Sequence, residues 1–305
     1  MLIFLSEGIT YGQNIPDDLN VVSKDKINKS EIMNEIQWLY KSINSDSSAI
    51  KVYFKEYNKD GVLTNQITYN PDGDILSESS YSYDESGKII SSFSNKPGEH
   101  GRIRNSYQYN SSDKLLKVET FDQNNSLVIS MDYKYGNNER LVELATKSAD
   151  NKISLLFSYI YDNDGNLIEV ISNDLKNNII TKGSFSYDAK GNQTQQLIYD
   201  HRGRMIQSIE KKYNTAGKVV DEVKKNTKGD IISRSTNKRD DKGNNVENVI
   251  SNPAANFSKK VVSKFDDNGN ILEQIIFNKL GEPVSRFVYE YEYYERSNTE
   301  IQLEE

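Results

Sequence analysis

A turn signal recurs along this chain at spacings of 12 and 14 residues, which alternate without a slip from residue 61 to residue 281. Two of the best copies are YDESGKII at 83–90 and YDNDGNLI at 161–168. Asp or Asn at the start of a type I turn accepts hydrogen bonds from the backbone, and Gly at its end adopts positive φ at little cost. Turns of this kind connect antiparallel strands. The strict register indicates a tandem array with a 26-residue unit of two hairpins.

The segments between the turns have the length and chemistry of β-strands. They are about seven to nine residues long and rich in Ile, Val, Thr, Ser and Tyr. A helix would not tolerate a Gly turn every dozen residues. The sequence therefore predicts an all-β domain over residues 49–295, built as one long antiparallel meander of about 18 strands.

Aromatic residues in this region fall almost entirely on odd numbers. From Tyr53 onward, 25 of 27 aromatic residues are odd, and only Phe54 and Tyr294 are not. Because side chains alternate between the two faces of a strand and every turn spacing is even, odd-numbered residues are expected to share one face. An apolar face of this size must be covered. We expect a curled or spiral sheet with the aromatic face inward, with a folded-over sandwich or a stack of two molecules as alternatives.

The two ends of the chain differ from the repeats. Residues 1–13, MLIFLSEGITYGQ, are similar to the tail of a secretory signal peptide, with a buried N-terminal strand as the alternative. Residues 14–48 are expected to form a linker and a capping helix over about 30–43, because Ile32, Ile36, Leu39 and Ile43 follow helical spacing. This helix, with Trp38 and Tyr40, would cover the first strand of the sheet. Residues 296–305 are polar and acidic and are expected to fray.

The repeating Tyr-Asp-x-x-Gly-Asn/Lys-Leu/Ile units resemble the YD repeats of the rearrangement-hotspot (Rhs) family over about four-fifths of the chain. In that family such repeats build long antiparallel sheets that spiral into hollow shells, often around a toxin, and isolated arrays are described as wall-associated or carbohydrate-binding. The resemblance implies the sheet but not the toxin, because these 305 residues include no toxin domain and the repeat unit is longer than usual. MORN-type hairpin repeats offer a weaker resemblance.

Composition and motifs exclude several functions. A net charge of −7 disfavours binding to a phosphate backbone, and the absence of cysteine excludes disulfides and thiolate metal sites. No segment is long enough to span a membrane, and no cofactor-binding loop of the Walker or Rossmann type is present. We therefore assign no catalytic residues, no cofactor and no metal. Calcium at the acidic turns 162–166 and 266–270 is a minor alternative.

Candidate catalytic groups are few. His100 and His201 lie in the turns of different repeats, which disfavours a hydrolytic triad. A carboxylate recurs four residues after many turns, and repetition of this kind indicates a structural role rather than a catalytic pair; these carboxylates are Glu143, Glu169, Glu247 and Glu273.

One stretch of the array, between Tyr213 and Phe257, lacks aromatic residues. By the odd-number rule its face carries charges instead, and tyrosines border it on the N-terminal side. Such a charged gap in an aromatic interior could hold an acidic sugar or peptide, whereas the plainer interpretation is decay of the repeat with solvated charges. The predicted ligand-binding residues are Asp221, Lys225, Arg239, Glu247, Tyr187 and Tyr213.

The sequence thus predicts a secreted or cell-envelope repeat protein without enzymatic activity that binds a glycan or an envelope protein. One alternative is a purely structural spacer or assembly element that pairs through sheet edges or forms a homodimer through a sheet face or edge. A glycan-active enzyme is the third hypothesis. No nucleic-acid partner is expected.

Overall fold

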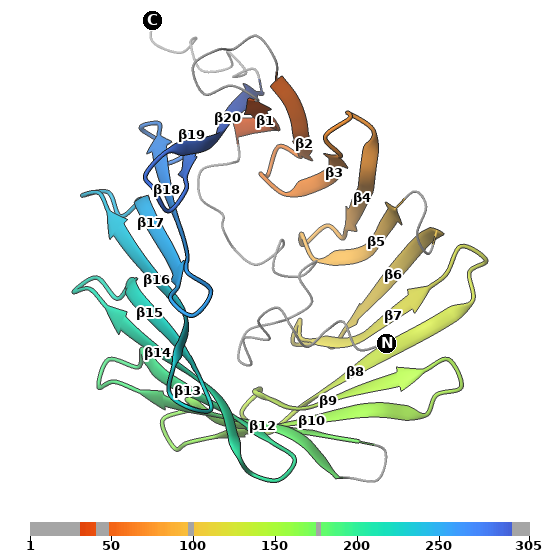
Figure 1. Ribbon diagram of the computed structural model, residues 1–305. Coiled ribbons are helices and arrows are strands. Elements are labelled where there is room, and N and C mark those ends of the chain that lie inside the picture. The colour runs from red at the N-terminus through yellow and green to blue at the C-terminus, as the bar shows by residue number, and fades with distance from the viewer. Residues whose placement is uncertain (1–30, 41–48, 97–100, 175–177, 295–305) are drawn as a thin grey trace, which may run out of the picture.

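The computed structural model describes residues 31–40, 49–96, 101–174 and 178–294. These residues form one antiparallel sheet of twenty strands that follow one another round a ring, as Figure 1 shows. No helix longer than a single residue in 3-10 conformation is found in these ranges. The strands are β1 (Ile32–Tyr40), β2 (Ala49–Tyr57), β3 (Leu63–Tyr69), β4 (Ile75–Tyr83), β5 (Ile89–Lys96), β6 (Gly101–Tyr109), β7 (Leu115–Phe121), β8 (Leu127–Tyr135), β9 (Leu141–Ser148), β10 (Ile153–Tyr161), β11 (Leu167–Asn173), β12 (Ile179–Tyr187), β13 (Gln193–Asp200), β14 (Met205–Tyr213), β15 (Val219–Asn226), β16 (Ile231–Arg239), β17 (Asn245–Asn252), β18 (Phe257–Phe265), β19 (Ile271–Phe277) and β20 (Pro283–Tyr293).

The sheet closes into a barrel through its first strand. β1 pairs antiparallel with β2 on one side and with β20 on the other, so Gln37 lies opposite both Tyr53 and Tyr289. The prediction of an open spiral, with a sandwich as its alternative, was therefore wrong. A closed sheet satisfies the edge groups that an open spiral would leave exposed.

The predicted helix over about 30–43 was also wrong in its described part, where Ile32–Tyr40 is strand β1. Its apolar residues do not share one face: Ile32 is buried in a cluster with Tyr57, whereas Ile36 lies opposite Phe54 on the other side of the sheet. The expected covering of the first strand is achieved by pairing rather than by packing. Without β1, the edges of β2 and β20 would lack hydrogen-bond partners. A strand can form backbone hydrogen bonds with both edges and a helix cannot, so these long-range hydrogen bonds outweigh the helical spacing of the apolar residues.

The predicted turns are present. The loop 84–88 is representative: the Gly87 amide donates to the Asp84 carbonyl at 2.9 Å, and Gly87 has a φ of 80°. Non-Gly residues occupy the same left-handed position in several other turns. The Asp84 carboxylate accepts the Ser86 and Lys88 amides, both at 2.9 Å. These hydrogen bonds hold the pKa of Asp84 below its ordinary value, led by the bond from the Ser86 hydroxyl.

A second irregularity follows each turn and changes which residues share a face. In the hairpins from β2–β3 to β19–β20, except β5–β6 and β17–β18, one aliphatic or hydroxyl residue just after the turn is skipped in the pairing. Ile90, for example, is skipped between Ile89, opposite Tyr83, and Ser91, opposite Ser82. One extra residue reverses the alternation. From mid-strand onward, odd-numbered residues therefore face inward on the even-numbered strands and outward on the odd-numbered strands from β3 to β19, so the single odd-number face was wrong. β1 is the exception, because its Gln37 lies on the same side as Tyr53 and Tyr289.

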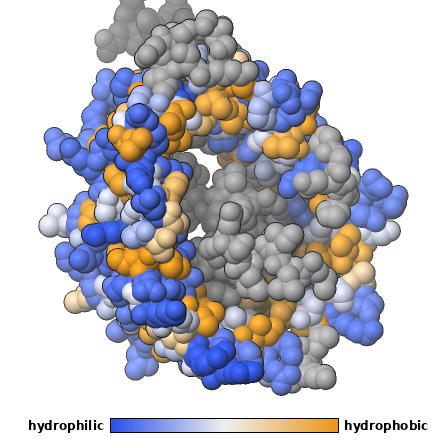
Figure 2. Space-filling model, viewed as in Figure 1, coloured by the Kyte–Doolittle hydropathy of each residue, from blue (hydrophilic) through white to orange (hydrophobic). Residues whose placement is uncertain are grey.

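The inner face of the barrel can be identified because side chains on the concave side of a curved sheet lie closer together than the strands that carry them. Tyr53 and Tyr289 lie two strands apart, which would be about 9–10 Å in a flat sheet, yet their ring centroids are 6.5 Å apart. The same face carries the buried cluster of Ile89, Tyr107, Val118 and Tyr133. Figure 2 shows hydrophobic residues bordering the central opening and hydrophilic residues over much of the periphery. The paired aromatics of the even strands thus point inward as predicted. Single aromatics of the odd strands lie on the outer face; they are Tyr69, Phe93, Phe121, Tyr199 and Phe277.

The outer face is held by ion pairs between neighbouring strands. A carboxylate four residues after a turn meets a cation thirteen residues later on the next strand, as in Asp221 with Arg234 at 2.9 Å. Glu169–Lys182, Glu247–Lys260 and Glu273–Arg286 repeat this relation at 2.5, 3.9 and 2.6 Å. Three of the four recurring glutamates of the sequence, Glu169, Glu247 and Glu273, are accordingly engaged in cross-strand contacts, which fits a structural role for them.

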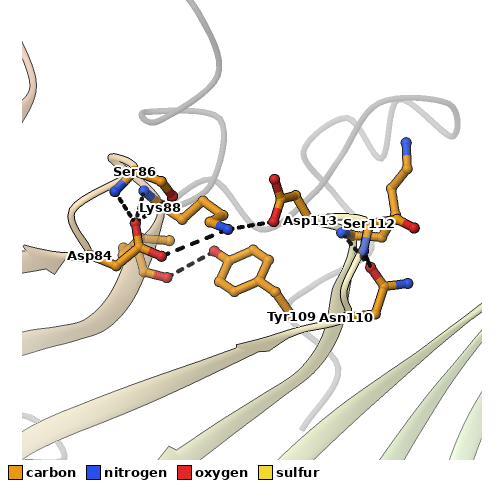
Figure 3. A network of polar contacts seen from close by, with 9 residues as sticks. Asp84, Ser86, Lys88, Tyr109, Asn110, Ser112 and Asp113 are labelled. Carbon is orange, nitrogen blue, oxygen red and sulfur yellow. Dashed lines mark hydrogen bonds and ion pairs between the residues drawn. The ribbon is translucent and has the colours of Figure 1, made fainter.

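A ladder of tyrosines ties successive hairpins together along one rim of the barrel. Each ring lies on the inner face at the end of an even strand, and its hydroxyl donates to the carbonyl of the residue twenty positions earlier. Figure 3 shows one step, where the Tyr109 hydroxyl donates to the Ile89 carbonyl at 2.8 Å and Lys88 bridges to Asp113 of the next turn at 2.5 Å. The other donors are Tyr83, Tyr135, Tyr161, Tyr187, Tyr213 and Tyr291.

We expect Tyr135→Phe to lower the free energy of unfolding by about 1 kcal/mol, because it removes one net hydrogen bond. The Tyr135 hydroxyl donates to the Leu115 carbonyl at 2.9 Å. Tyr133→Phe is the matched control, because the buried Tyr133 hydroxyl has no hydrogen-bond partner in the described structure. Urea denaturation of both variants measures the difference. Equal midpoints for the two would show that the ladder does not stabilise the barrel.

Candidate functional site

The inner face changes character across five neighbouring strands. From β4 to β13 it carries mainly tyrosines, aliphatics and hydroxyls, whereas across β14–β18 amides and charges replace them. We call the inner-facing polar residues of this region the polar stripe. They are Lys211, Glu222, Lys224, Ser235, Asn237, Asn248 and Lys259, each half-buried.

Register places these residues on the inner face. Lys224 lies directly opposite Ile209, a buried inner residue, and opposite Ser233 of the next strand. Ser235 lies opposite Glu222, and Asn237 lies opposite Asn248. Residues directly opposite one another in an antiparallel pair project to the same side.

The amides of the polar stripe form a small network. The Asn248 amide nitrogen donates to the Ser235 hydroxyl at 2.8 Å and to the Asn237 side-chain oxygen at 2.9 Å. Lys211 lies 3.8 Å from Glu222. Within the described residues, no carboxylate pairs with Lys224 or Lys259. The stripe thus offers ammonium groups and amides whose hydrogen-bonding capacity is not used up inside the barrel.

A hollow of about 440 Å³ lies at the rim beside the N-terminal end of the stripe. Lys211 and Tyr213 contribute from β14, and the turn from Asp188 to Asn192 forms its other side. Burial raises the pKa of Tyr213, whose hydroxyl donates to the Gln193 carbonyl at 2.6 Å. The Tyr213 hydroxyl is therefore fixed as a donor, and its ring is the part available to a ligand.

Three of the six predicted ligand-binding residues lie on the outer face. Asp221 pairs with Arg234 at 2.9 Å, Lys225 pairs with Glu210 at 2.7 Å, and Glu247 approaches Lys260 at 3.9 Å. The bulge after each turn explains the error, because it exchanges the faces of odd and even residues on β15 and β17. The inner-facing neighbours are Glu222, Lys224 and Asn248.

The other three predicted residues lie on the inner side at one rim. Tyr187 and Tyr213 are consecutive members of the tyrosine ladder. Arg239 occupies the ladder position that follows Tyr213, where its Nη1 donates to the Gly243 carbonyl at 2.9 Å and its buried Nε has no partner in the described structure. The structure therefore brings the tyrosines beside the polar stripe but separates them from Asp221, Lys225 and Glu247.

A sequence signal could have assigned the faces correctly. Tyr-x-Tyr pairs such as Tyr81 and Tyr83 occur only on every second strand, while the intervening strands of the array carry at most one aromatic, such as Tyr69. A sheet with one continuous aromatic face would not alternate in this way. The alternation of paired and single aromatics from strand to strand therefore indicates the bulged residue after the turns.

Groups with catalytic or metal-binding potential are dispersed. No cluster of three or more His, Asp or Glu side chains suited to a metal occurs in the described residues. His201 is exposed in a turn, where Arg202 Nε approaches its ring nitrogen at 3.2 Å, and His100 lies outside the described residues. In the first turn considered for calcium, Asp162 accepts the Asn166 amides at 2.8 and 2.9 Å. Calcium binding stays a prediction.

The described part of the chain contains no helix that is long and apolar enough to cross a membrane.

Fold and site define the chain as a closed antiparallel barrel of repeated hairpins with an aromatic and polar interior. No protein-family model and no curated protein sequence matches it. Among solved structures, a porin-like protein from Bacteroides uniformis is similar at 11% identity and a TM-score of 0.38, covering 86% of this chain and 98% of that one. A porin-like protein from Bacteroides vulgatus has 11% identity and a TM-score of 0.27, over 86% and 98% of the two chains. TcdB2-TccC3 without its hypervariable C-terminal region has 10% identity and a TM-score of 0.25.

The match to TcdB2-TccC3 covers 84% of this chain and 19% of that one. At these identities and TM-scores the likenesses support no conclusion about activity or partners. The resemblance to YD repeats stays a prediction from the repeated motif.

Proposed function

We propose that this protein is a non-enzymatic binding module that holds a carbohydrate chain against the inner face of its barrel. The polar stripe is the observation that carries the proposal, because amides and ammonium groups on neighbouring strands lie next to tyrosine rings. A sugar ring stacks on an aromatic face while its hydroxyls take hydrogen bonds from fixed polar groups. The outer face of the same strands is less suited, because its charges are paired with one another, as Asp221 is with Arg234 and Lys225 with Glu210.

The outer ion pairs also support a barrel that works in water. A barrel that spans a bilayer presents an apolar band to lipid, and charges at its middle are costly. Here Asp221 and Arg234, or Glu169 and Lys182, lie within the strands on the outer side. We propose that the protein acts in the aqueous space outside the cell or at the cell envelope. The signal-peptide prediction concerns residues 1–13, which lie outside the described residues.

The closed barrel bears on the structural alternative, in which the protein assembles through sheet edges or through a sheet face. A spacer or homodimer that assembles through sheet edges needs a free strand edge. Each of the strands described here has a neighbour on both sides, because β1 closes the sheet between β2 and β20. Association through a sheet face is unaffected by closure.

A glycan array of neutral and acidic oligosaccharides tests the proposal, followed by titration of the strongest hit in a thermal-shift assay. Lys224→Ser should weaken binding of that hit by about tenfold, equivalent to about 1.4 kcal/mol. Lys225→Ser is the matched control, because Lys225 is the next residue but points outward to Glu210. Binding should also raise the melting temperature in proportion to ligand concentration.

The proposal would be contradicted by an array without hits, or by equal losses in the Lys224 and Lys225 variants. Equal losses would place the binding surface away from the interior. Turnover of a polysaccharide by the purified protein would instead support the enzyme hypothesis.

A further inference from the structure

The outer face over β1, β2 and β3 differs from the rest of the barrel exterior. On several other strands, such as β11–β12 and β18–β20, cross-strand ion pairs lie on the outer face, whereas here aromatic and aliphatic side chains lie opposite one another. Ile36 lies opposite Phe54, Phe54 lies opposite Ile67, and Trp38 lies opposite Val288. We call this area the outer seam surface. It consists of Ile36, Trp38, Phe54, Ile67, Tyr69 and Val288, all partly exposed.

A lysine is held among three rings at the centre of this surface. Lys51 Nζ lies 5.4 Å from the ring centroid of Trp38, 5.9 Å from that of Phe54 and 5.7 Å from that of Tyr69. Aromatic faces attract cations at distances within about 6 Å. The three rings together form an aromatic cage that is occupied by a side chain of the same molecule.

Exposed carboxylates surround the outer seam surface without cationic partners in the described part of the chain. Glu290 accepts the Trp38 indole N–H at 2.9 Å, and Glu292 accepts the Asn34 amide at 2.5 Å. Glu56 and Glu78 are exposed on β2 and β4. By contrast, Glu169 and Glu273, on the outer face of β11 and β19, each have a lysine or arginine partner.

We propose that the outer seam surface is a docking site for a basic segment of a partner protein. A lysine or arginine of the partner would take the place of Lys51 among the rings, and further basic side chains would meet the four carboxylates. Aliphatic groups of the partner would cover Ile36 and Ile67. A second copy of this chain suits the surface less well, because it would bring the unpaired carboxylates of two acidic molecules together.

Trp38 is the only tryptophan of the chain, so its fluorescence reports on this surface alone. We would titrate the full chain with a short peptide of alternating lysine and leucine and follow the emission. A saturable change that weakens with added salt is expected. A peptide of alternating glutamate and leucine should produce no change.

Variants make the test specific. The double change Glu290→Gln and Glu292→Gln should weaken peptide binding by about tenfold, since two attractive charges are lost. Lys51→Gln should strengthen binding severalfold, because it empties the cage. The control is Glu85→Gln with Glu139→Gln, two carboxylates in turns away from the seam; it should bind as the unchanged protein does, and thermal unfolding verifies the fold of each variant.

Equal binding by the Glu290/Glu292 variant and the control would overturn the proposal, as would weaker binding by the Lys51 variant. Sedimentation that shows self-association without peptide, abolished by Trp38→Ala, would assign the surface to a second copy and also overturn it.

Discussion

Replacing Glu35 with alanine is expected to lower the free energy of unfolding by about 3–5 kcal/mol, since it breaks a buried charged network. Glu35 lies on β1, and the residue is only 5% exposed. It accepts the Tyr53 hydroxyl at 2.5 Å and the Tyr57 hydroxyl at 2.7 Å, and Lys55 lies 3.9 Å away. Alanine would leave these buried donors without their acceptor.

The position of Glu35 makes this loss larger than that of a single hydrogen bond. β1 is the strand that joins the two ends of the repeat array, and the three Glu35 partners Tyr53, Lys55 and Tyr57 belong to β2. On the β20 side, Gln37 donates to the Tyr289 hydroxyl at 2.6 Å. We therefore expect local opening between β1 and β2 as well as lower global stability.

Urea denaturation measures the global effect, and hydrogen exchange of the β2 amides measures the opening. Glu85→Ala is the control, because Glu85 is an exposed turn residue whose replacement should change stability by less than about 0.5 kcal/mol. If Glu35→Ala matched this control, barrel closure would not depend on the buried carboxylate.

The second large effect is expected in alkali. Burial, followed by the charge of Glu35, raises the pKa of Tyr53 and Tyr57 far above the ordinary value of about 10. Burial also raises the pKa of Tyr109 to about 12. The pKa values of Tyr83, Tyr133 and Tyr291 are raised mainly by burial as well.

The direction of the pH dependence follows from these shifts. Above pH 10 the tyrosines of the unfolded chain lose their protons while those of the folded barrel keep them. Ionisation of these tyrosines favours the unfolded chain. The free energy of unfolding therefore keeps its full value below pH 10 and falls as the pH rises toward the pKa values of the folded state. Each such tyrosine contributes a slope of up to about 1.4 kcal/mol per pH unit, so several together should unfold the barrel cooperatively.

Tyrosinate absorbance and circular dichroism, followed together above pH 10, test this expectation. Buried tyrosines should ionise in the same step in which the β-sheet signal disappears. Tyr57→Phe removes one proton-release site and should make the unfolding transition less steep in pH. Gradual ionisation with an intact sheet signal would show that the hydroxyls are accessible to solvent in the folded state.

The hairpins and their turns could be predicted from sequence because they are encoded locally. An Asp or Asn, two variable residues and a Gly suffice to set a type I turn with a left-handed closing residue. The Asp84 carboxylate and Gly87 form such a turn with contacts that span only a few residues. Strand order in the array follows directly, because each hairpin joins neighbours.

The two faces could not be assigned from residue numbers. A single bulged residue after each turn, Ile90 for example, exchanges inward and outward positions. The predicted charged gap covers the same strands as the polar stripe, but Asp221, Lys225 and Glu247 lie on the outer face and their neighbours Glu222, Lys224 and Asn248 lie on the inner face.

The sequence by itself determined the repeated hairpins, their turns and the strand character of the array, since these depend on contacts within a few residues. Only the tertiary structure decided that the array closes, that Ile32–Tyr40 is its closing strand, and that Glu35 is buried against Tyr53 and Tyr57. Closure joins residues more than 200 positions apart, as between Gln37 and Tyr289. The pairing partner of β1 exists only once the whole array has curled, so no local pattern could prescribe it.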